Sequence, residues 1–167
     1  MCLLLLGLPA CASLEPRCSN DWQITGYYTP VEASYDGDLA TIVVDDQQIS
    51  FASDFLRAVK MEGWGKTDQG WYLGYYSKTW HKSAEPLNRH GKSLQLGMAA
   101  VDPTVVAMGT RFYVPSLGHH LGQQVFVAAD VGGRIQRKHI DIYTGEGEQA
   151  QRATYAVTGT HQLCYAP

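Results

Sequence analysis

AADVGGRIQRKHIDIY, residues 128–143, contains two strand-like apolar runs that each carry one aspartate. The first run reaches Asp130. Two glycines and a basic segment separate it from the second run, which carries Asp141. Gly132 and Gly133 can adopt backbone angles that other residues avoid, so we expect the chain to turn there and fold the two runs back toward each other. The stretch therefore predicts that two carboxylates share one site.

Short apolar runs of this kind, separated by Pro and Gly, recur along the chain, and two of them belong to this stretch. They cover residues 22–28, 97–101, 110–114, 124–129, 139–143 and 162–165. This spacing favours a small β-barrel over a βαβ sheet. Most residues between 147 and 156 are good helix formers, which predicts one helix. A second helix is predicted from Ser53 to Gly63, because its apolar residues are spaced to share one face.

The segment at about 37–95 is rich in aromatic residues and is expected to form a small inserted subdomain. Its candidates for stacking on sugar rings are Trp64, Trp71, Tyr75, Tyr76 and Trp80. Flat amphipathic rings suit sugar stacking, although most such residues pack in cores. Residues 77–93 are polar and basic, which is typical of a solvated surface loop. The functional alternative is a mobile wall that gathers an anionic polymer.

Length and composition set limits on the kind of protein. The chain has 167 residues, of which 45% are hydrophobic, and this is enough for one domain with a single core. The net charge of −3 gives no reason to expect a nucleic-acid partner. The sequence has no Cys-x-x-Cys pair and no paired histidine spacing typical of a metal site. We therefore expect no metal site, and the family resemblance given below implies no organic cofactor either.

Residues 1–18 are predicted to be an export signal with a lipobox and a tether, which leaves residues 19–167 for the folded domain. A short apolar run ends in small residues before Cys11, and it is too short to span a bilayer. The order Leu-Pro-Ala-Cys resembles a bacterial lipobox, whose cysteine is acylated and becomes the mature N-terminus. An ordinary cleaved signal peptide is the alternative. We expect a periplasmic protein, either anchored through Cys11 at the outer membrane of a Gram-negative cell or free.

The remaining cysteines suggest a covalent link between the ends of the domain. If Cys2 is removed and Cys11 is lipidated, Cys18 and Cys164 are left, one near each end. In an oxidising compartment this pair can form a disulfide that closes most of the chain into a loop. Free buried thiols are the alternative.

Four motifs in a fixed order carry a resemblance to a known family. They are AVDP at 100–103, MGTRFYVP at 108–115, ADVGG at 129–133 and HIDIYTGEGEQA at 139–150. Together they resemble the three-aspartate (3D) domain of MltA-like membrane-bound lytic transglycosylases, over about residues 97–165. TGYYTPV at 25–31 resembles the opening strand of those enzymes. The resemblance implies a mainly β fold, namely a six-stranded double-psi β-barrel with a small insert and one or two short helices.

The resemblance also implies functional roles for single residues. Asp141 matches the aspartate that acts first as acid and then as base, and Asp130 is expected to favour its protonated form by charge repulsion. The implied substrate-binding residues are Asp102, Tyr27, Tyr28, Thr29, Gly132, Gly133, Arg137 and Lys138. Asp102 precedes Pro103, so capping a loop is the alternative role for it. The usual lysine and glycine of the family are Gln136 and Arg137 here, and Arg137 or Lys138 can supply the missing charge.

The implied activity is cleavage of peptidoglycan without water. A lytic transglycosylase cuts the β-1,4 bond between N-acetylmuramic acid and N-acetylglucosamine, and the C6 hydroxyl of the muramic acid attacks to give a 1,6-anhydro end. We expect a monomer that acts on glycan strands in cell-wall turnover. The full transglycosylase inserts a larger second domain where this chain has only residues 37–95, so a shallower groove is expected. The alternative is a non-catalytic, expansin-like module that binds glycan strands.

Overall fold

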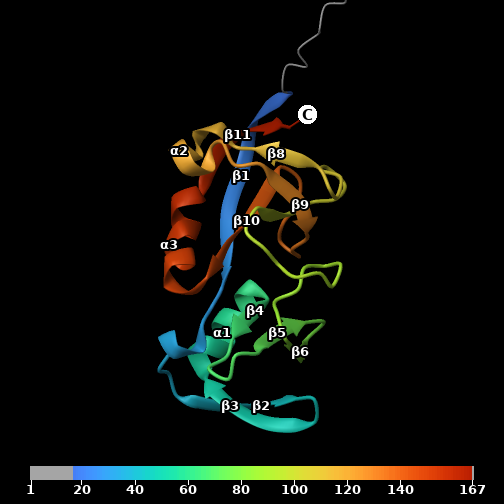
Figure 1. Cartoon of the computed structure of the whole chain (residues 1–167). Coiled ribbons are helices and arrows are strands. Elements are labelled where there is room, and N and C mark those ends of the chain that lie inside the picture. The colour runs from blue at the N-terminus through green and yellow to red at the C-terminus, as the bar shows by residue number, and fades with distance from the viewer. Residues whose placement is uncertain (1–16, 167) are drawn as a thin grey trace, which may run out of the picture.

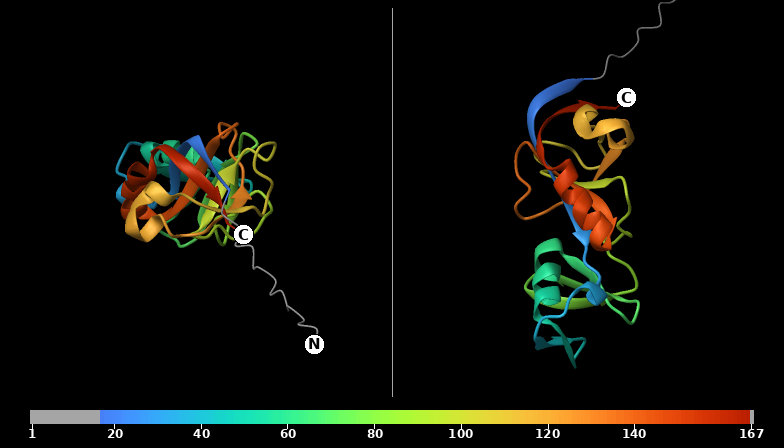
Figure 2. Two further views of the ribbon diagram at one scale, coloured as in Figure 1. Left: turned by 90° about the horizontal axis from the view of Figure 1, so that it is seen from above. Right: turned by 90° about the vertical axis from the view of Figure 1, so that its left-hand side faces the viewer.

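A computed structural model describes residues 17–166 of the chain. These residues form a β-barrel at one end of a long axis and a smaller body at the other end, as Figures 1 and 2 show. We call the smaller body, residues 30–97, the insert. The predicted export signal and the acylation of Cys11 lie outside the described residues. Within those residues, no helix is long and apolar enough to cross a membrane.

The barrel is closed and contains both parallel and antiparallel strand pairs. Its strands are β1 (Cys18–Thr29), β7 (Met98–Val101), β8 (Arg111–Tyr113), β9 (Phe126–Asp130), β10 (His139–Glu146) and β11 (Gly159–Tyr165). Around the barrel they follow the order β1-β10-β7-β9-β8-β11. The β1–β10 and β7–β9 pairs are parallel, and the other pairs are antiparallel. This confirms the predicted mainly β fold with a six-stranded barrel.

Alternation along the strands directs apolar side chains into the barrel. Ile140 and Ile142 of β10 are 0% and 2% exposed in the barrel core, and Asp141 between them points to the other face. On β1, Trp22 and Ile24 are buried in the same core, and the intervening residues face outward. The two adjacent strands therefore present their polar side chains on one outer surface.

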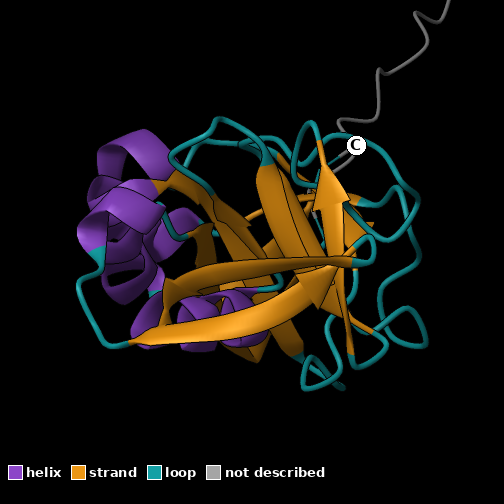
Figure 3. Ribbon diagram, turned by 90° about the horizontal axis from the view of Figure 1, so that it is seen from below, coloured by secondary structure: helices purple, strands orange, loops and turns teal. Residues whose placement is uncertain are grey.

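The long C-terminal helix α3 (Gly147–Val157) covers β1 and β10. A Cβ atom at Gly26 of β1 would lie 2.7 Å from the backbone Cα of Thr154, so only glycine permits this close packing. A shorter helix, α2 (Gly118–Leu121), follows the 3₁₀ turn η2 (Pro115–Leu117) beside β11. Figure 3 shows that the helices gather on one side of the strands.

The insert has a hydrophobic core of its own. Its elements are η1 (Glu32–Ser34), β2 (Leu39–Val44), β3 (Gln47–Ala52), α1 (Ser53–Glu62), β4 (Trp64–Lys66), β5 (Tyr72–Tyr76) and β6 (Thr79–Ser83). The strands form a β2–β3 hairpin and a β4-β5-β6 sheet. Phe51, Phe55, Val59 and Leu73 are at most 2% exposed between them. The polar segment predicted as a surface loop, residues 77–93, contains the strand β6. The polar side chains of this strand concealed it in the sequence, and it pairs with β5 along one edge only.

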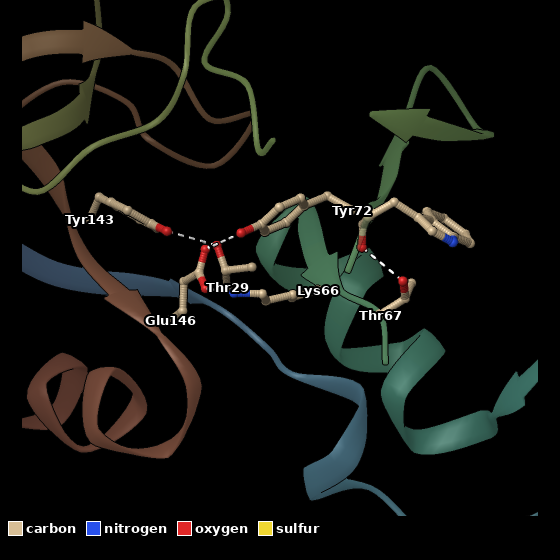
Figure 4. Close-up of polar contacts among 7 residues, drawn as sticks. Thr29, Lys66, Thr67, Tyr72, Tyr143 and Glu146 are labelled. Carbon is tan, nitrogen blue, oxygen red and sulfur yellow. Dashed lines mark hydrogen bonds and ion pairs between the residues drawn. The ribbon is translucent and has the colours of Figure 1, made fainter. Parts of the chain in front are cut away.

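A network of polar side chains joins the insert to the barrel (Figure 4). Glu146 of β10 accepts a hydrogen bond of 2.6 Å from the Tyr72 hydroxyl and forms an ion pair of 2.9 Å with Lys66. The hydroxyls of Thr29 and Tyr143 are hydrogen-bonded at 2.9 Å beside them. Because Tyr72 and Lys66 belong to the insert and Glu146 to the barrel, these contacts fix the two bodies relative to each other.

A disulfide joins Cys18 to Cys164, as the sequence predicted. The two residues are direct partners on the antiparallel strands β1 and β11. The disulfide therefore adds a covalent link to the pairing of β1 with β11.

The disulfide is expected to stabilise the fold mainly by restricting the unfolded chain. For a sequence separation of 146 residues, chain entropy predicts that Cys18→Ser with Cys164→Ser lowers the free energy of unfolding by up to about 4–5 kcal/mol. The melting temperature should then fall by about 10 °C, which calorimetry measures. Wild-type protein in reductant should show the same fall, and the double variant should not respond to reductant. Equal melting temperatures for oxidised and reduced wild type would contradict this prediction.

Candidate functional site

A cavity of about 670 Å³ lies between the barrel and the insert. The barrel contributes Tyr27, Ala100, Asp130, Gly132, Gly133 and Asp141 to its lining. The insert contributes mainly Lys60, Glu62, Trp64, Tyr75, Tyr76 and Arg89. The cavity therefore contains both catalytic aspartates predicted from the sequence.

The strand register brings the two aspartates to one place. Ala100 of β7 is the partner of Asp141 on β10 and also of Asp130 on β9. The two carboxylates thus lie two strands apart, on either side of a small methyl group. The aspartates are therefore brought near one another, as expected, and strand β7 lies between the two strands that carry them.

The turn between β9 and β10 also differs from the expectation. Neither Gly132 nor Gly133 has a positive φ angle, whereas Arg137 does, at 59°. Gly132 is needed for space, because a Cβ atom there would lie 2.7 Å from the side chain of Ile135. Gly132 therefore makes room for the buried Ile135 under the turn, and the residue with left-handed backbone geometry is Arg137.

Asp141 is held by a chain of side-chain hydrogen bonds. Thr25, its direct partner on β1, donates a hydrogen bond of 2.6 Å to Oδ1 of Asp141. The Oγ1 atom of Thr25 lies 2.9 Å from Nε2 of His139, and since Thr25 gives its one proton to Asp141, it accepts from His139. The carboxyl group therefore has a fixed orientation toward the cavity.

Burial is the main cause of a raised pKa at Asp141. The Thr25 hydrogen bond and the charge of His139 oppose this rise, and repulsion by Asp130 adds to it as the smallest of these effects. Asp130 therefore raises the pKa of Asp141, as predicted, but the removal of Asp141 from water raises it more. A raised pKa suits a group that must carry a proton before it donates it.

Asp130 is also partly withdrawn from water. Its carboxylate accepts hydrogen bonds of 2.9 Å from the backbone N–H groups of Arg89 and Val131, and one of 3.2 Å from the Tyr27 hydroxyl. Burial raises the pKa of Asp130, and these hydrogen bonds oppose the rise. The hydrogen bond from Arg89 to Asp130 links the segment after β6 to strand β9 of the barrel.

Asp102 has a structural position outside the cavity. Its Oδ1 accepts hydrogen bonds from the backbone and hydroxyl of Thr104, and its Oδ2 accepts one of 2.6 Å from the backbone N–H of Arg137. These bonds lower the pKa of Asp102. The substrate-binding assignment of Asp102 is therefore replaced by the capping alternative, in which it holds the turn that contains Arg137.

Four other predicted substrate-binding residues lie away from the cavity. Tyr28 is 7% exposed and its hydroxyl pairs with that of Tyr35, so it is a packing residue. Thr29 is 1% exposed and contacts the hydroxyl of Tyr143. Arg137 and Lys138 are exposed and do not line the cavity, and the Lys138 ammonium donates to the Asn20 carbonyl. Of the predicted Tyr27-Tyr28-Thr29 segment, only Tyr27 lines the cavity.

One wall of the cavity is aromatic. Trp64, Tyr75 and Tyr76 line it, and Tyr76 is 50% exposed. Trp71 is instead packed in the core of the insert, and Trp80 packs against that core. Three of the five stacking candidates therefore face the cavity.

Sequence reasoning gave no role to several residues of the site. Thr25 begins the TGYYTPV segment, and its position opposite Asp141 depends on a register that the sequence does not reveal. Glu62 lies on the apolar face of α1, in line with Phe55 and Val59. An acidic residue on an otherwise apolar helix face could have marked Glu62 as a candidate site residue. Among the side chains that the structure describes, no group of three or more His, Cys, Asp or Glu is placed to hold a metal ion.

Comparison with known proteins supports the resemblance seen in the four motifs. Residues 98–162 match the family model of the 3D domain, and this range includes Asp130 and Asp141. The predicted resemblance to 3D-domain, MltA-like proteins is therefore confirmed. No curated protein matches the chain.

Solved structures with a similar fold are lytic transglycosylases. E. coli MltA with bound chitohexaose has a TM-score of 0.63 at 15% identity, covering 89% of this chain and 73% of that chain. A membrane-bound lytic murein transglycosylase from Agrobacterium tumefaciens has a TM-score of 0.61 at 14% identity, with coverages of 87% and 74%. LtgG of Burkholderia pseudomallei has 0.55 at 16% identity, with coverages of 90% and 74%. Coverage this high includes the insert, so the shared fold extends beyond the barrel.

The raised pKa of Asp141 predicts a pH-dependent cost to stability. Its ordinary value is 3.8, so at neutral pH the folded protein ionises a carboxyl group that burial disfavours. Asp141→Asn is expected to raise the melting temperature by a few degrees at neutral pH, because the amide carries no charge. The gain should shrink as the pH falls through the raised pKa of the folded protein toward 3.8, because Asp141 then takes up its proton in the folded form.

Calorimetry of both proteins between pH 4 and 8 checks this prediction. Asp36→Asn is a matched control, because Asp36 is an exposed aspartate of the insert outside the cavity. The control should show no such trend. A difference between wild type and Asp141→Asn that is the same at pH 4 and pH 7 would count against the burial of this charge.

Proposed function

We propose that this protein is a lytic transglycosylase that cleaves the β-1,4 bond between N-acetylmuramic acid and N-acetylglucosamine in peptidoglycan. The observation that carries the proposal is the position of Asp141. Its carboxyl group lies in the cavity between barrel and insert, is oriented by Thr25, and has a pKa raised by burial. The 3D-domain match and the fold shared with a transglycosylase that holds chitohexaose support this choice.

One carboxyl group is sufficient for the reaction. Protonated Asp141 gives its proton to the glycosidic oxygen while the bond from that oxygen to C1 of the muramic acid breaks, and the N-acetylglucosamine leaves as an alcohol. Positive charge develops at C1. The C6 hydroxyl oxygen then bonds to C1, and ionised Asp141 takes the hydroxyl proton. The product is a 1,6-anhydro ring, and Asp141 is protonated again without the use of water.

The neighbouring groups adjust the charge of Asp141 in each step. Thr25 donates a hydrogen bond to the ionised carboxylate, so it supports the intermediate in which the proton has been given away. Asp130 adds a second negative charge to the cavity, which favours the protonated start and attracts the cationic C1. Tyr27 keeps Asp130 in place through its hydroxyl.

The aromatic wall suits the binding of a glycan strand. Trp64, Tyr75 and Tyr76 line the cavity from the insert, and the two aspartates line it from the barrel. Lys60 lies 5.3 Å from the centre of the Tyr75 ring, which keeps a cation beside the same wall. Peptidoglycan strands carry carboxylates, so a cation at this position favours the polymer.

We also propose that the chain is exported to the periplasm and anchored to the outer membrane through Cys11. The Cys18–Cys164 disulfide supports export, because such bonds persist in oxidising compartments.

The main test is the chemistry of the products. Wild-type protein incubated with peptidoglycan sacculi should release 1,6-anhydro-muropeptides, which mass spectrometry identifies. Asp141→Asn should reduce their rate of release by about 10²- to 10⁴-fold, the usual contribution of a general acid and base. Asp36→Asn, the exposed control, should retain wild-type activity.

Other products would lead to other conclusions. Reducing ends in place of anhydro ends would mean that water attacks, and the protein would be a hydrolase. Binding to sacculi without any cleavage would favour the non-catalytic, expansin-like module.

Asp130 should influence the pH dependence of cleavage. The acid step needs protonated Asp141, so activity falls as the pH rises through the pKa of that group. Asp130→Asn removes a charge that raises this pKa, and the alkaline limb of the kcat/KM profile should therefore move to lower pH. Anhydro-muropeptide release measured from pH 4 to 8 tests this. An unchanged alkaline limb would contradict the coupling of the two aspartates.

A further inference from the structure

The cavity contains a third carboxyl group, on the side opposite the aspartates. Glu62 is the last residue of α1 and lines the cavity from the insert. Its Oε2 atom accepts a hydrogen bond of 3.2 Å from the backbone N–H of Tyr28. In the part of the chain that the structure describes, the side chain forms this one hydrogen bond, and none reaches its Oε1 atom. One oxygen therefore anchors the side chain to β1, and the other is free to meet a ligand.

This position is unfavourable for a charged group. Phe55 and Val59 on the same helix face are 0% exposed, so Glu62 continues an apolar stripe. It also lies in the last turn of α1, where the partial negative charge of the helix end disfavours a carboxylate. An apolar side chain would satisfy the packing at lower cost. The acidic group therefore calls for an explanation beyond stability.

The surroundings favour the protonated form of Glu62. The groups around it that titrate or carry charge are Tyr27 and Tyr28 of β1, Lys60 of α1, Arg89, Asp130 and Asp141, together with the two tyrosines of β5. Burial raises the pKa of Glu62 to about 7, the Tyr28 N–H opposes this rise, and repulsion by Asp141 adds to it. A large fraction of Glu62 is thus neutral below pH 7.

We propose that Glu62 is a second glycan-binding acid of this cavity, which in its protonated form donates a hydrogen bond from Oε1 to an acceptor oxygen of the sugar, such as an acetamido carbonyl. This inference rests on the proposed function, because it places a glycan in the same cavity. Glu62 would then position the strand from the insert while Asp141 acts on it from the barrel. The role is specific to the neutral form, since a carboxylate cannot donate.

Binding of chitohexaose at different pH values tests this role. Calorimetric titrations use an Asp141→Asn background, so that the sugar is not cleaved. With Glu62 present, affinity should fall by about 3- to 10-fold between pH 5.5 and 8.5, which corresponds to the loss of one hydrogen bond. Adding Glu62→Gln should give affinity that is nearly constant over this range, because an amide donates at every pH. It also keeps an acceptor for the Tyr28 N–H.

A third variant separates hydrogen bonding from packing. Glu62→Leu keeps the apolar bulk but cannot donate, so it should bind weakly at every pH, as the Glu62 protein does at pH 8.5. The proposal is overturned if affinity has the same pH dependence with and without the Glu62→Gln substitution, or if chitohexaose does not bind at any pH. Cleavage of sacculi by wild type is measured separately, so a failure of the proposed function is distinguishable from a failure of this inference.

Melting temperatures give a readout that needs no ligand. The pKa of Glu62 is about 7 in the folded protein and has an ordinary value of 4.5, so ionisation costs stability as the pH rises between these values. The melting temperature of Glu62→Gln relative to wild type should therefore increase from pH 5 to pH 8. A difference that stays constant would show that Glu62 is not held neutral, and it would overturn the proposal.

Discussion

The register of β10 between β1 and β7 is the constraint on which the site depends. In that register Asp141 lies beside Thr25 on one strand and Ala100 on the other, and Ala100 in turn lies beside Asp130. A shift of one residue would turn Asp141 into the barrel core and an isoleucine toward the cavity. The buried isoleucines on either side of Asp141 oppose such a shift, so the hydrophobic core itself fixes the acid.

The insert converts this acidic surface of the barrel into a cavity. The polar network around Glu146 holds the two bodies together, and the hydrogen bond from Tyr28 to Glu62 adds a contact nearer to the aspartates. The result is a cavity with two aspartates on the barrel side and with aromatic rings and a further acid on the insert side. A compact insert of this size is therefore enough to build an opposing wall.

Much of the barrel could be predicted, because its strands alternate cleanly and its motifs stand in a recognisable order. Asp141 and Asp130 were predicted for the same reason. Asp102 was misassigned, since the sequence does not show which loop its carboxylate reaches, and that loop lies far along the chain. Glu62 was not assigned a role, because its neighbours come from β1 and β10, and a helix pattern alone does not reveal what it faces. In each case the prediction failed because the sequence does not show which distant segments lie next to each other.

The position of β1 also determines when this protein can fold. β1 pairs with β10 and β11, the last two strands of the chain, and the Cys18–Cys164 bond links the same two ends. β1 therefore finds its barrel partners only far along the sequence, as in the pairing of Thr25 with Asp141, 116 residues away. Closing the barrel requires contacts of this long range, which make folding slow. Until β10 and β11 have paired with it, the edge of β1 can pair with wrong partners.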